Sequence, residues 1–306
     1  MRGGLQEILD LEQVEDHFFR GRSRPVAETR VFGGEVAGQA LVAAARTVAD
    51  PGRRVHSLHA YFLRPGDPGR PILYQVDPVR DGRSFTTRRV VGIQHGEAIF
   101  VLSASFQVAE PGLRHQLPVV PARDPDGLPT AAEALRGSGE LTTGWLEQVG
   151  RTFPVELRFP GELPRVATAR GEARPPRQVV WMRSTEPLPD DPALHACAAT
   201  YFSDLLLLPT ALLPHRVLLG DPRLRIASLD HAVWFHAPFR ADDWLCYEQE
   251  GPWAGGGRAL CRGSLFDRHG TLVATVMQEG LIRVRSEVAG AQTRPGGERT
   301  VAGADG

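Results

Sequence analysis

The sequence predicts an α+β protein made of two similar halves, each with one long helix followed by antiparallel strands. At 306 residues the chain is at the upper limit for a single hydrophobic core, so two domains are the better expectation. The order of helix and strand patterns in the first half also recurs in the second. A tight glycine turn joins two of the strands, as expected for antiparallel neighbours.

The helices of the first half follow from the spacing of apolar residues. Residues 5–18 carry apolar side chains at near-helical spacing with acidic residues on the other face, which predicts a leading amphipathic helix. After the glycine pair 33–34, apolar residues from 36 to 48 form one broad helical stripe. The Asp-Pro-Gly sequence at 50–52 is expected to end this helix.

Four strand patterns complete the first half. His95 and Gly96 form a two-residue link between the third and fourth of them, with glycine in the second position, as tight hairpins prefer. The alternation of apolar residues predicts strands at residues 55–64, 71–79, 84–94 and 97–108.

The second half repeats this order after a region rich in proline and glycine. We expect a first repeat at 1–110, a linker at 111–165, a second repeat at 166–285 and a disordered tail at 286–306. The second repeat has a helix pattern through residues 194–208. Its strands are expected at residues 225–237, 244–250, 258–268 and 271–284.

Two matching separations indicate a duplicated domain. The turn His269-Gly270 follows His95-Gly96 by 269 − 95 = 174 residues. The pattern Trp234-Phe235-x-x-Pro238 follows Tyr61-Phe62-x-x-Pro65 by 235 − 62 = 173 residues. Because both separations fall between strands of matching type, we predict two copies of one unit.

Charge and composition limit the classes of partner. A formal net charge of -1 provides no field that would attract a nucleic acid. The three cysteines have no C-x-x-C pairing, which fits neither a disulfide framework nor a zinc site. Acidic residues interrupt the N-terminal apolar positions, and we find no apolar run suited to a membrane span. We therefore expect a cytoplasmic protein that binds neither nucleic acid nor membrane.

The common catalytic motifs are missing from the sequence. It contains no G-x-S-x-G, no G-x-x-x-x-G-K and no H-E-x-x-H. The histidine pairs His56/His59 and His231/His236 have odd spacings, which on a strand point the two side chains to opposite faces. We therefore expect neither a metal nor an organic cofactor.

A glutamine on the last strand is the first candidate site residue. Gln278 shares its strand parity with a row of apolar residues, so its amide is expected to face the core. An unpaired buried amide costs about 1–3 kcal/mol, so partners are required. At the separation of the repeats, the first half has Ala104 in this position. The alternative is a structural glutamine that ties a loop or the helix in place.

Other polar residues are candidates by their neighbourhood. Asp204 precedes four leucines, and a carboxylate at the edge of an apolar helix is a candidate general base, or else a cap. Ser228 lies near the start of a strand, where a serine can also simply bind backbone. Arg80 and Arg83 flank the turn at Gly82 and could bind substrate phosphates, or only be solvated.

These segments resemble those of the bacterial acyl-CoA thioesterase II family, which are double hotdog proteins. The likeness covers most of the chain. It is carried in the first half by FGGEVAGQA (32–40), HSLHAYFLRPG (56–66) and RDGRSF (80–85), and in the second by YFSDL (201–205), LDHAVWFH (229–236) and QEG (278–280).

The resemblance implies a fold, a reaction and a site. The fold would be a double hotdog, with each repeat a long helix wrapped by an antiparallel sheet. The reaction would be hydrolysis of acyl-CoA to fatty acid and CoA, in a homodimer or larger homo-oligomer. Asp204, Ser228 and Gln278 would surround the attacking water. The family often has threonine where this chain has Ser228, a change that keeps the hydroxyl.

Two other functions stay open at this point. A hotdog enoyl-CoA hydratase or dehydratase would need a histidine paired with an acid, and His59 or His231 would then be indispensable. A non-catalytic acyl-CoA-binding protein would bind ligand without releasing thiol. Chain-length preference does not follow from the sequence, because it depends on side chains that meet across two sheets.

Overall fold

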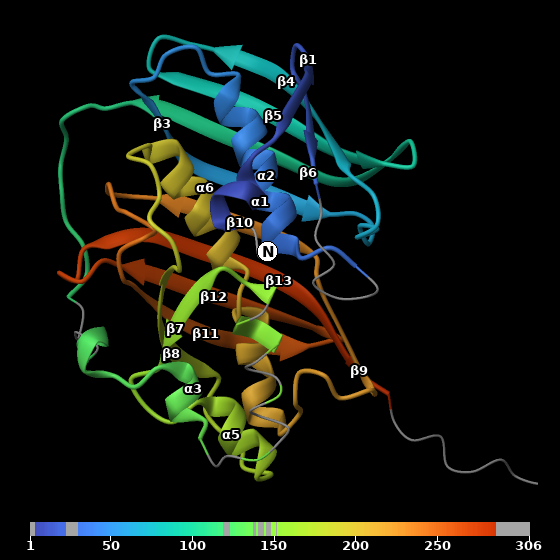
Figure 1. Ribbon diagram of the computed structural model, residues 1–306, viewed down its shortest axis with the longest axis vertical. Coiled ribbons are helices and arrows are strands. Elements are labelled where there is room, and N and C mark those ends of the chain that lie inside the picture. Colours follow the sequence, from blue (N-terminus) through green and yellow to red (C-terminus); the bar gives the residue numbers. More distant parts are fainter. Residues whose placement is uncertain are drawn as a thin grey trace, which may run out of the picture.

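The structure is a computed structural model that describes residues 4–22, 30–118, 123–136, 139, 144, 148–150 and 152–285. One 13-stranded sheet packs against two central helices, α2 (Gly33–Arg46) and α6 (Pro192–Ser203). Figure 1 shows the strands of the first half at the top, in blue to green, and those of the second half below, in yellow-green to red.

The first repeat has the predicted helix and strands. In the order β4-β5-β6-β3, neighbouring strands are antiparallel and their bounds lie within a few residues of the predicted ones. His95 and Gly96 both have positive φ, 52° and 76°, so the predicted hairpin turn is confirmed. The strands are β3 (Arg53–Phe62), β4 (Ile72–Asp81), β5 (Phe85–Gln94) and β6 (Glu97–Val108).

The second repeat has the same order with two differences. The predicted helix ends at Ser203, and a 3-10 helix, η2 (Leu208–His215), follows. The single strand predicted at 225–237 is broken in two, because β9 pairs only with β13 whereas β10 pairs with both β13 and β3. The strands are β8 (Arg177–Ser184), β9 (Leu224–Ser228), β10 (Asp230–Phe235), β11 (Leu245–Gly255), β12 (Arg258–Phe266) and β13 (Leu272–Val284).

Strand pairing and helix packing both join the repeats. Strands β3 and β10 pair antiparallel, with Ala60 opposite His231 and Leu58 opposite Val233, so the two sheets are continuous. The helices α2 and α6 pack antiparallel and very closely. A Cβ on Gly34 would lie 2.4 Å from the Tyr201 carbonyl oxygen. This packing places the end of α6 against the start of α2.

The leading helix predicted at 5–18 is wrong beyond its first turns. Helix α1 (Leu5–Leu9) is followed by a hairpin of β1 (Glu12–Glu15) and β2 (Phe18–Gly21), and β2 pairs with β4 at the sheet edge. Val14 is 43% exposed, so the apolar spacing that suggested a longer helix does not reflect one buried face. Pairing with β4 satisfies backbone groups that a surface helix would satisfy internally.

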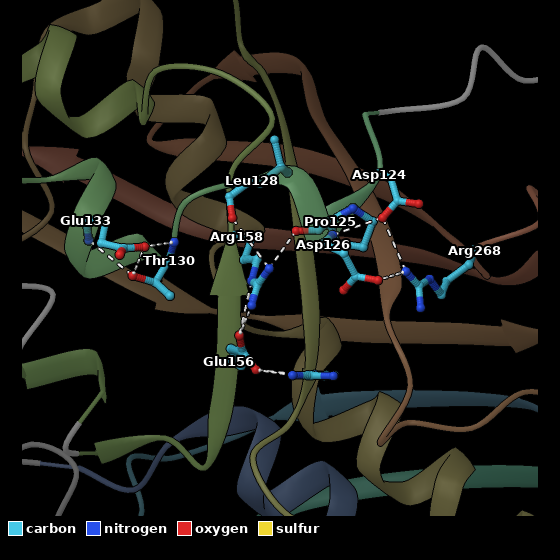
Figure 2. A network of polar contacts seen from close by, with 10 residues as sticks. Asp124, Pro125, Asp126, Leu128, Thr130, Glu133, Glu156, Arg158 and Arg268 are labelled. Carbon is cyan, nitrogen blue, oxygen red and sulfur yellow. Dashed lines mark hydrogen bonds and ion pairs between the residues drawn. The ribbon is translucent and has the colours of Figure 1, made fainter.

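Part of the predicted linker belongs to the sheet. Strand β7 (Val155–Arg158) pairs with β8 at the far edge, and a four-residue strand is too short for a periodic signal. Figure 2 shows the polar contacts of this region: Arg158 donates to the Pro125 carbonyl oxygen at 2.7 Å, and Arg268 binds Asp124 and Asp126. Further helices within the described part of the chain include η1 (Pro125–Gly127), α3 (Ala131–Ala134) and α5 (Pro164–Ala169).

The repeat boundaries stay predictions, and the tail predicted at 286–306 lies outside the described residues. Among the described helices, the stretch Pro192–His215 is long and apolar enough to cross a membrane by length and composition alone. Of its most apolar window, 89% is buried inside the protein. Packing within this fold therefore accounts for its hydrophobicity.

Candidate active site

The three candidate residues meet where α6 ends. Asp204 is the C-cap of α6, and Ser228 is the last residue of β9. Gln278 lies on β13, next to β9, and its side chain is fully buried as its strand parity predicts. Residues that are far apart in sequence are thus brought together by the pairing of β9 with β13 and by the packing of α6 on the sheet.

The three side chains are in direct contact. The Gln278 amide nitrogen donates to Asp204 Oδ1 at 2.5 Å and to Ser228 Oγ at 3.1 Å. The Ser228 hydroxyl donates to the same Asp204 oxygen at 3.3 Å. In this orientation the Gln278 amide presents its NH2 group to the Asp204 carboxylate. The flipped amide would place its oxygen against the carboxylate, and two acceptors would then face each other. The expected convergence is therefore present, while the catalytic roles stay predictions.

The second oxygen of Asp204 faces the start of α2. Gly34 N donates to Asp204 Oδ2 at 2.9 Å, and the positive end of a helix favours a nearby carboxylate. A Cβ on Gly33 would lie 2.7 Å from that same oxygen. The two glycines therefore permit an approach that a side chain would prevent.

A thiol beside the site is not a nucleophile. Cys261 on β12 lies opposite Gln278 and is fully buried. Burial raises the pKa of this thiol to about 12, so it stays protonated near neutral pH. The polar groups available for chemistry here are the carboxylate, the hydroxyl, the amide and the backbone N–H groups of α2.

The first repeat has no equivalent of this polar set. Thr47 is the C-cap of α2, as Asp204 is of α6. Ser228 lies opposite Gly280, and the matching pair in the first repeat is Val55 opposite Phe106. With Ala104 in place of Gln278, the equivalent positions are occupied by threonine, valine and alanine. The three polar side chains of the candidate site therefore all come from the second repeat.

The predicted phosphate-binding residues lie elsewhere in the chain. The segment of Arg80, Gly82 and Arg83 lies near the C-terminal end of α2, because Arg88 joins Asp81 to Thr47. Asp204 faces the other end of that helix, which spans about 21 Å for its 14 residues. The structure therefore does not bring these residues to Asp204, and their role in binding substrate stays a prediction.

A groove of about 1650 Å³ also lies at that opposite end of the helices. Arg46, Arg53 and His195 are among its lining residues, and none of the three candidate residues lines it. Its volume makes this groove a second candidate for a binding site. The grouping of carboxylate, hydroxyl and amide favours the other end instead.

The histidines are not arranged as a hydratase or a metal site would need. His59 is on the exposed face of β3, where its ring meets the edge of Trp234 at 5.1 Å, whereas Asp204 lies on the inner face. His231 is buried and contacts Ser203. Within the described residues, no group of three or more His, Cys, Asp or Glu side chains could hold a metal ion.

Two features of the site were not predicted from the sequence. The first is the approach of the glycine pair 33–34 to Asp204, although two glycines in the first turn of a helix are a signal of close approach. The second is the contact of His231 with Ser203. That contact joins residues of two elements and has no sequence signal.

Comparison with solved structures supports the fold. An acyl-CoA thioesterase II, TesB2, from Mycobacterium marinum matches with a TM-score of 0.73 and 46% identity, over 92% of this chain and 99% of that one. A protein with a hot dog fold from Alicyclobacillus acidocaldarius, whose function is unknown, has a TM-score of 0.73 at 19% identity, over 92% and 98%. The fold is a double hotdog, as predicted.

Sequence comparison then gives the family. A family model described as acyl-CoA thioesterase matches residues 149–281, and one for the acyl-CoA thioesterase N-terminal domain matches residues 21–107. Human acyl-coenzyme A thioesterase 8 is 41% identical over 92% of this chain and 89% of its own length. The chain belongs to the acyl-CoA thioesterase family, so the predicted resemblance is confirmed.

Proposed function

We propose that the protein hydrolyses acyl-CoA thioesters to a free fatty acid and CoA, with a water molecule activated by Asp204. Family membership supports the reaction. The contact of one carboxylate oxygen with both an amide and a hydroxyl supports the assignment of the site. This contact is the observation that carries the proposal.

The thioester is a suitable substrate for a site with one base. Its carbonyl is poorly stabilised by resonance, and its thiol leaving group has a pKa of about 8.5, so it departs without full protonation. Asp204 accepts a proton as the water attacks the carbonyl carbon, and the C–S bond then breaks. Ser228 and Gln278 orient the carboxylate and the water, so that the water is already positioned for attack on the carbonyl carbon.

The start of α2 is the candidate for stabilising the oxyanion. The N–H of Gly33 lies in the first turn of α2, next to the Gly34 N–H that binds Asp204. A backbone donor in a helix's first turn can bind developing negative charge without reorganising. The same turn would thus contact both the base and the reacting carbonyl.

The substitution Asp204→Asn tests the base. Asparagine keeps the size of the side chain and the acceptor for Gly34, but it cannot take a proton from water. We expect most thiol release from palmitoyl-CoA to be lost, with an unchanged melting temperature within a few degrees. Turnover near that of the wild type in the folded variant would refute the assignment.

Two rival functions predict different outcomes in the same experiment. A hydratase would hydrate an enoyl-CoA and would depend on a histidine paired with an acid. His59 is exposed outside the site, and the Nε2 of the buried His231 is engaged by Ser203 and not by a carboxylate. A binding protein would retain acyl-CoA without releasing thiol. Thiol release, enoyl-CoA hydration and ligand binding by the wild-type protein therefore separate the three functions.

The assembly and location of the protein are further parts of the proposal. We expect a homodimer or larger assembly, supported by Tyr61, which is 60% exposed on the outer face beside the β3–β10 junction. Tyr61→Glu should then lower the mass measured by light scattering. A cytoplasmic location and a place in fatty acid metabolism are supported by three buried free cysteines and by the expected product. Cell fractionation tests the location.

A further inference from the structure

A histidine occupies an apolar position of the core, and only in the repeat that carries Asp204. His231 on β10 is 1% exposed. At the repeat spacing, its counterpart on β3 is Leu58, which is fully buried. The strand register agrees with this match. In the pairing of β3 with β10, His231 lies opposite Ala60, and Leu58 lies opposite Val233. The two pairs occupy equivalent places in the two repeats. The fold therefore accepts leucine here, and the imidazole needs a specific explanation.

The contacts of His231 define its protonation. Its Nε2 lies 2.7 Å from Ser203 Oγ, and the Ser203 hydroxyl donates to the Thr200 carbonyl oxygen at 2.8 Å. A hydroxyl has one proton, so both contacts are satisfied together when His231 is the donor to Ser203. Burial also lowers the pKa of His231, which favours the neutral ring, although the charges of Asp204 and Asp230 oppose this. The ring is thus a neutral donor through Nε2.

Ser203 directly precedes Asp204 in a turn that several side chains hold. The Tyr247 hydroxyl donates to the Ser203 carbonyl oxygen at 2.8 Å. Gln249 donates to the Leu205 carbonyl oxygen at 3.0 Å. Leu206 then leaves α6 at φ 66°, a left-handed conformation that costs a leucine free energy. This turn depends on side-chain contacts for its shape, and the contacts from His231 and Tyr247 both reach Ser203, the residue next to Asp204.

We propose that His231 is a positioning residue: through Ser203 it holds the end of α6 so that the Asp204 carboxylate faces Ser228 and Gln278. It does not contact the reacting atoms in this arrangement. The inference rests on the proposed role of Asp204 as the base. A misplaced base slows proton transfer more than it weakens substrate binding, so the effect belongs to kcat and not to KM.

Four variants and one control test this inference in steady-state thiol-release assays. His231→Leu introduces the residue of the first repeat, and Ser203→Ala removes the acceptor. We expect each to lower kcat by about 10- to 100-fold with KM changed by less than about threefold. Both substitutions break the same contact between His231 and Ser203, so their effects should not add. The kcat of the double variant should therefore lie within about twofold of the kcat of the slower single variant. His231→Gln keeps a donor near Nε2 and should recover most of the loss.

The control is a second histidine–serine pair on the same sheet. His56 Nε2 lies 2.8 Å from Ser105 Oγ, away from Asp204, so His56→Leu should lower stability without changing kcat. Three results would overturn the inference: a kcat for His231→Leu within about twofold of the wild type, losses that multiply in the double variant, or a loss in KM alone. If Asp204→Asn retains activity, the proposed base fails instead. If Asp204→Asn is inactive and His231→Leu is fully active, only the positioning role fails.

Discussion

Replacing Gln278 by methionine removes the amide of the site while keeping the length of the side chain. The lost contacts are the 2.5 Å donation to Asp204 and the 3.1 Å donation to Ser228. A hydrogen bond to a charged group contributes about 1.5–3 kcal/mol. At about 1.36 kcal/mol per tenfold in rate, its loss from the transition state lowers kcat by about 10- to 150-fold. Stability should also fall, by up to about 3 kcal/mol, because Asp204 and Ser228 each lose a donor in the folded state.

Thiol release from acyl-CoA measures kcat, and urea unfolding measures stability. The matched control is Gln94→Met, which removes a buried glutamine of the first repeat whose amide donates to the carbonyl oxygens of Asp67 and Arg70. That variant should lose stability and keep its kcat. The reasoning would be refuted by a folded Gln278→Met enzyme with kcat within about threefold of the wild type, or by an equal loss of kcat in the control.

Three further outcomes follow from the packing and the charges. Gly34→Ala should lower the free energy of unfolding by about 1–3 kcal/mol in urea and reduce turnover, because its Cβ would meet the Tyr201 carbonyl oxygen at 2.4 Å. Burial lowers the pKa of His231 below its ordinary 6.5, so the folded state resists a proton that the unfolded chain accepts. The neutral ring of His231 therefore stabilises the folded state above about pH 6.5, and this stabilisation is lost as the pH falls below that value. The difference in the free energy of unfolding between wild type and His231→Leu, measured in urea, should decrease from about pH 7.5 to 5.5. Arg88 is 3% exposed and donates to Thr47. The variant Arg88→Met should be less stable by about 2–3 kcal/mol but keep a normal kcat, as thermal unfolding and steady-state kinetics would measure.

Periodic patterns predicted the elements that are long and have one buried face. Strands β5 and β6 were expected almost to the residue and helix α2 to within a few residues, because each alternates or repeats over ten or more positions. The pattern at 5–18 was wrong because a few apolar residues at helical spacing cannot distinguish a helix from a turn and a hairpin. Strand β7, with four residues, gave no signal at all.

The sequence by itself determined the duplicated architecture and the inward direction of Gln278, because strand parity and repeat spacing are properties of local order along the chain. Only the tertiary structure decided that Asp204 and Ser228 contact that amide, that Gly34 reaches the same carboxylate, and that His231 binds Ser203. These contacts join elements far apart in sequence. Their distances depend on how closely α2 and α6 pack and on which strands pair. The periodicity of a single segment predicts neither.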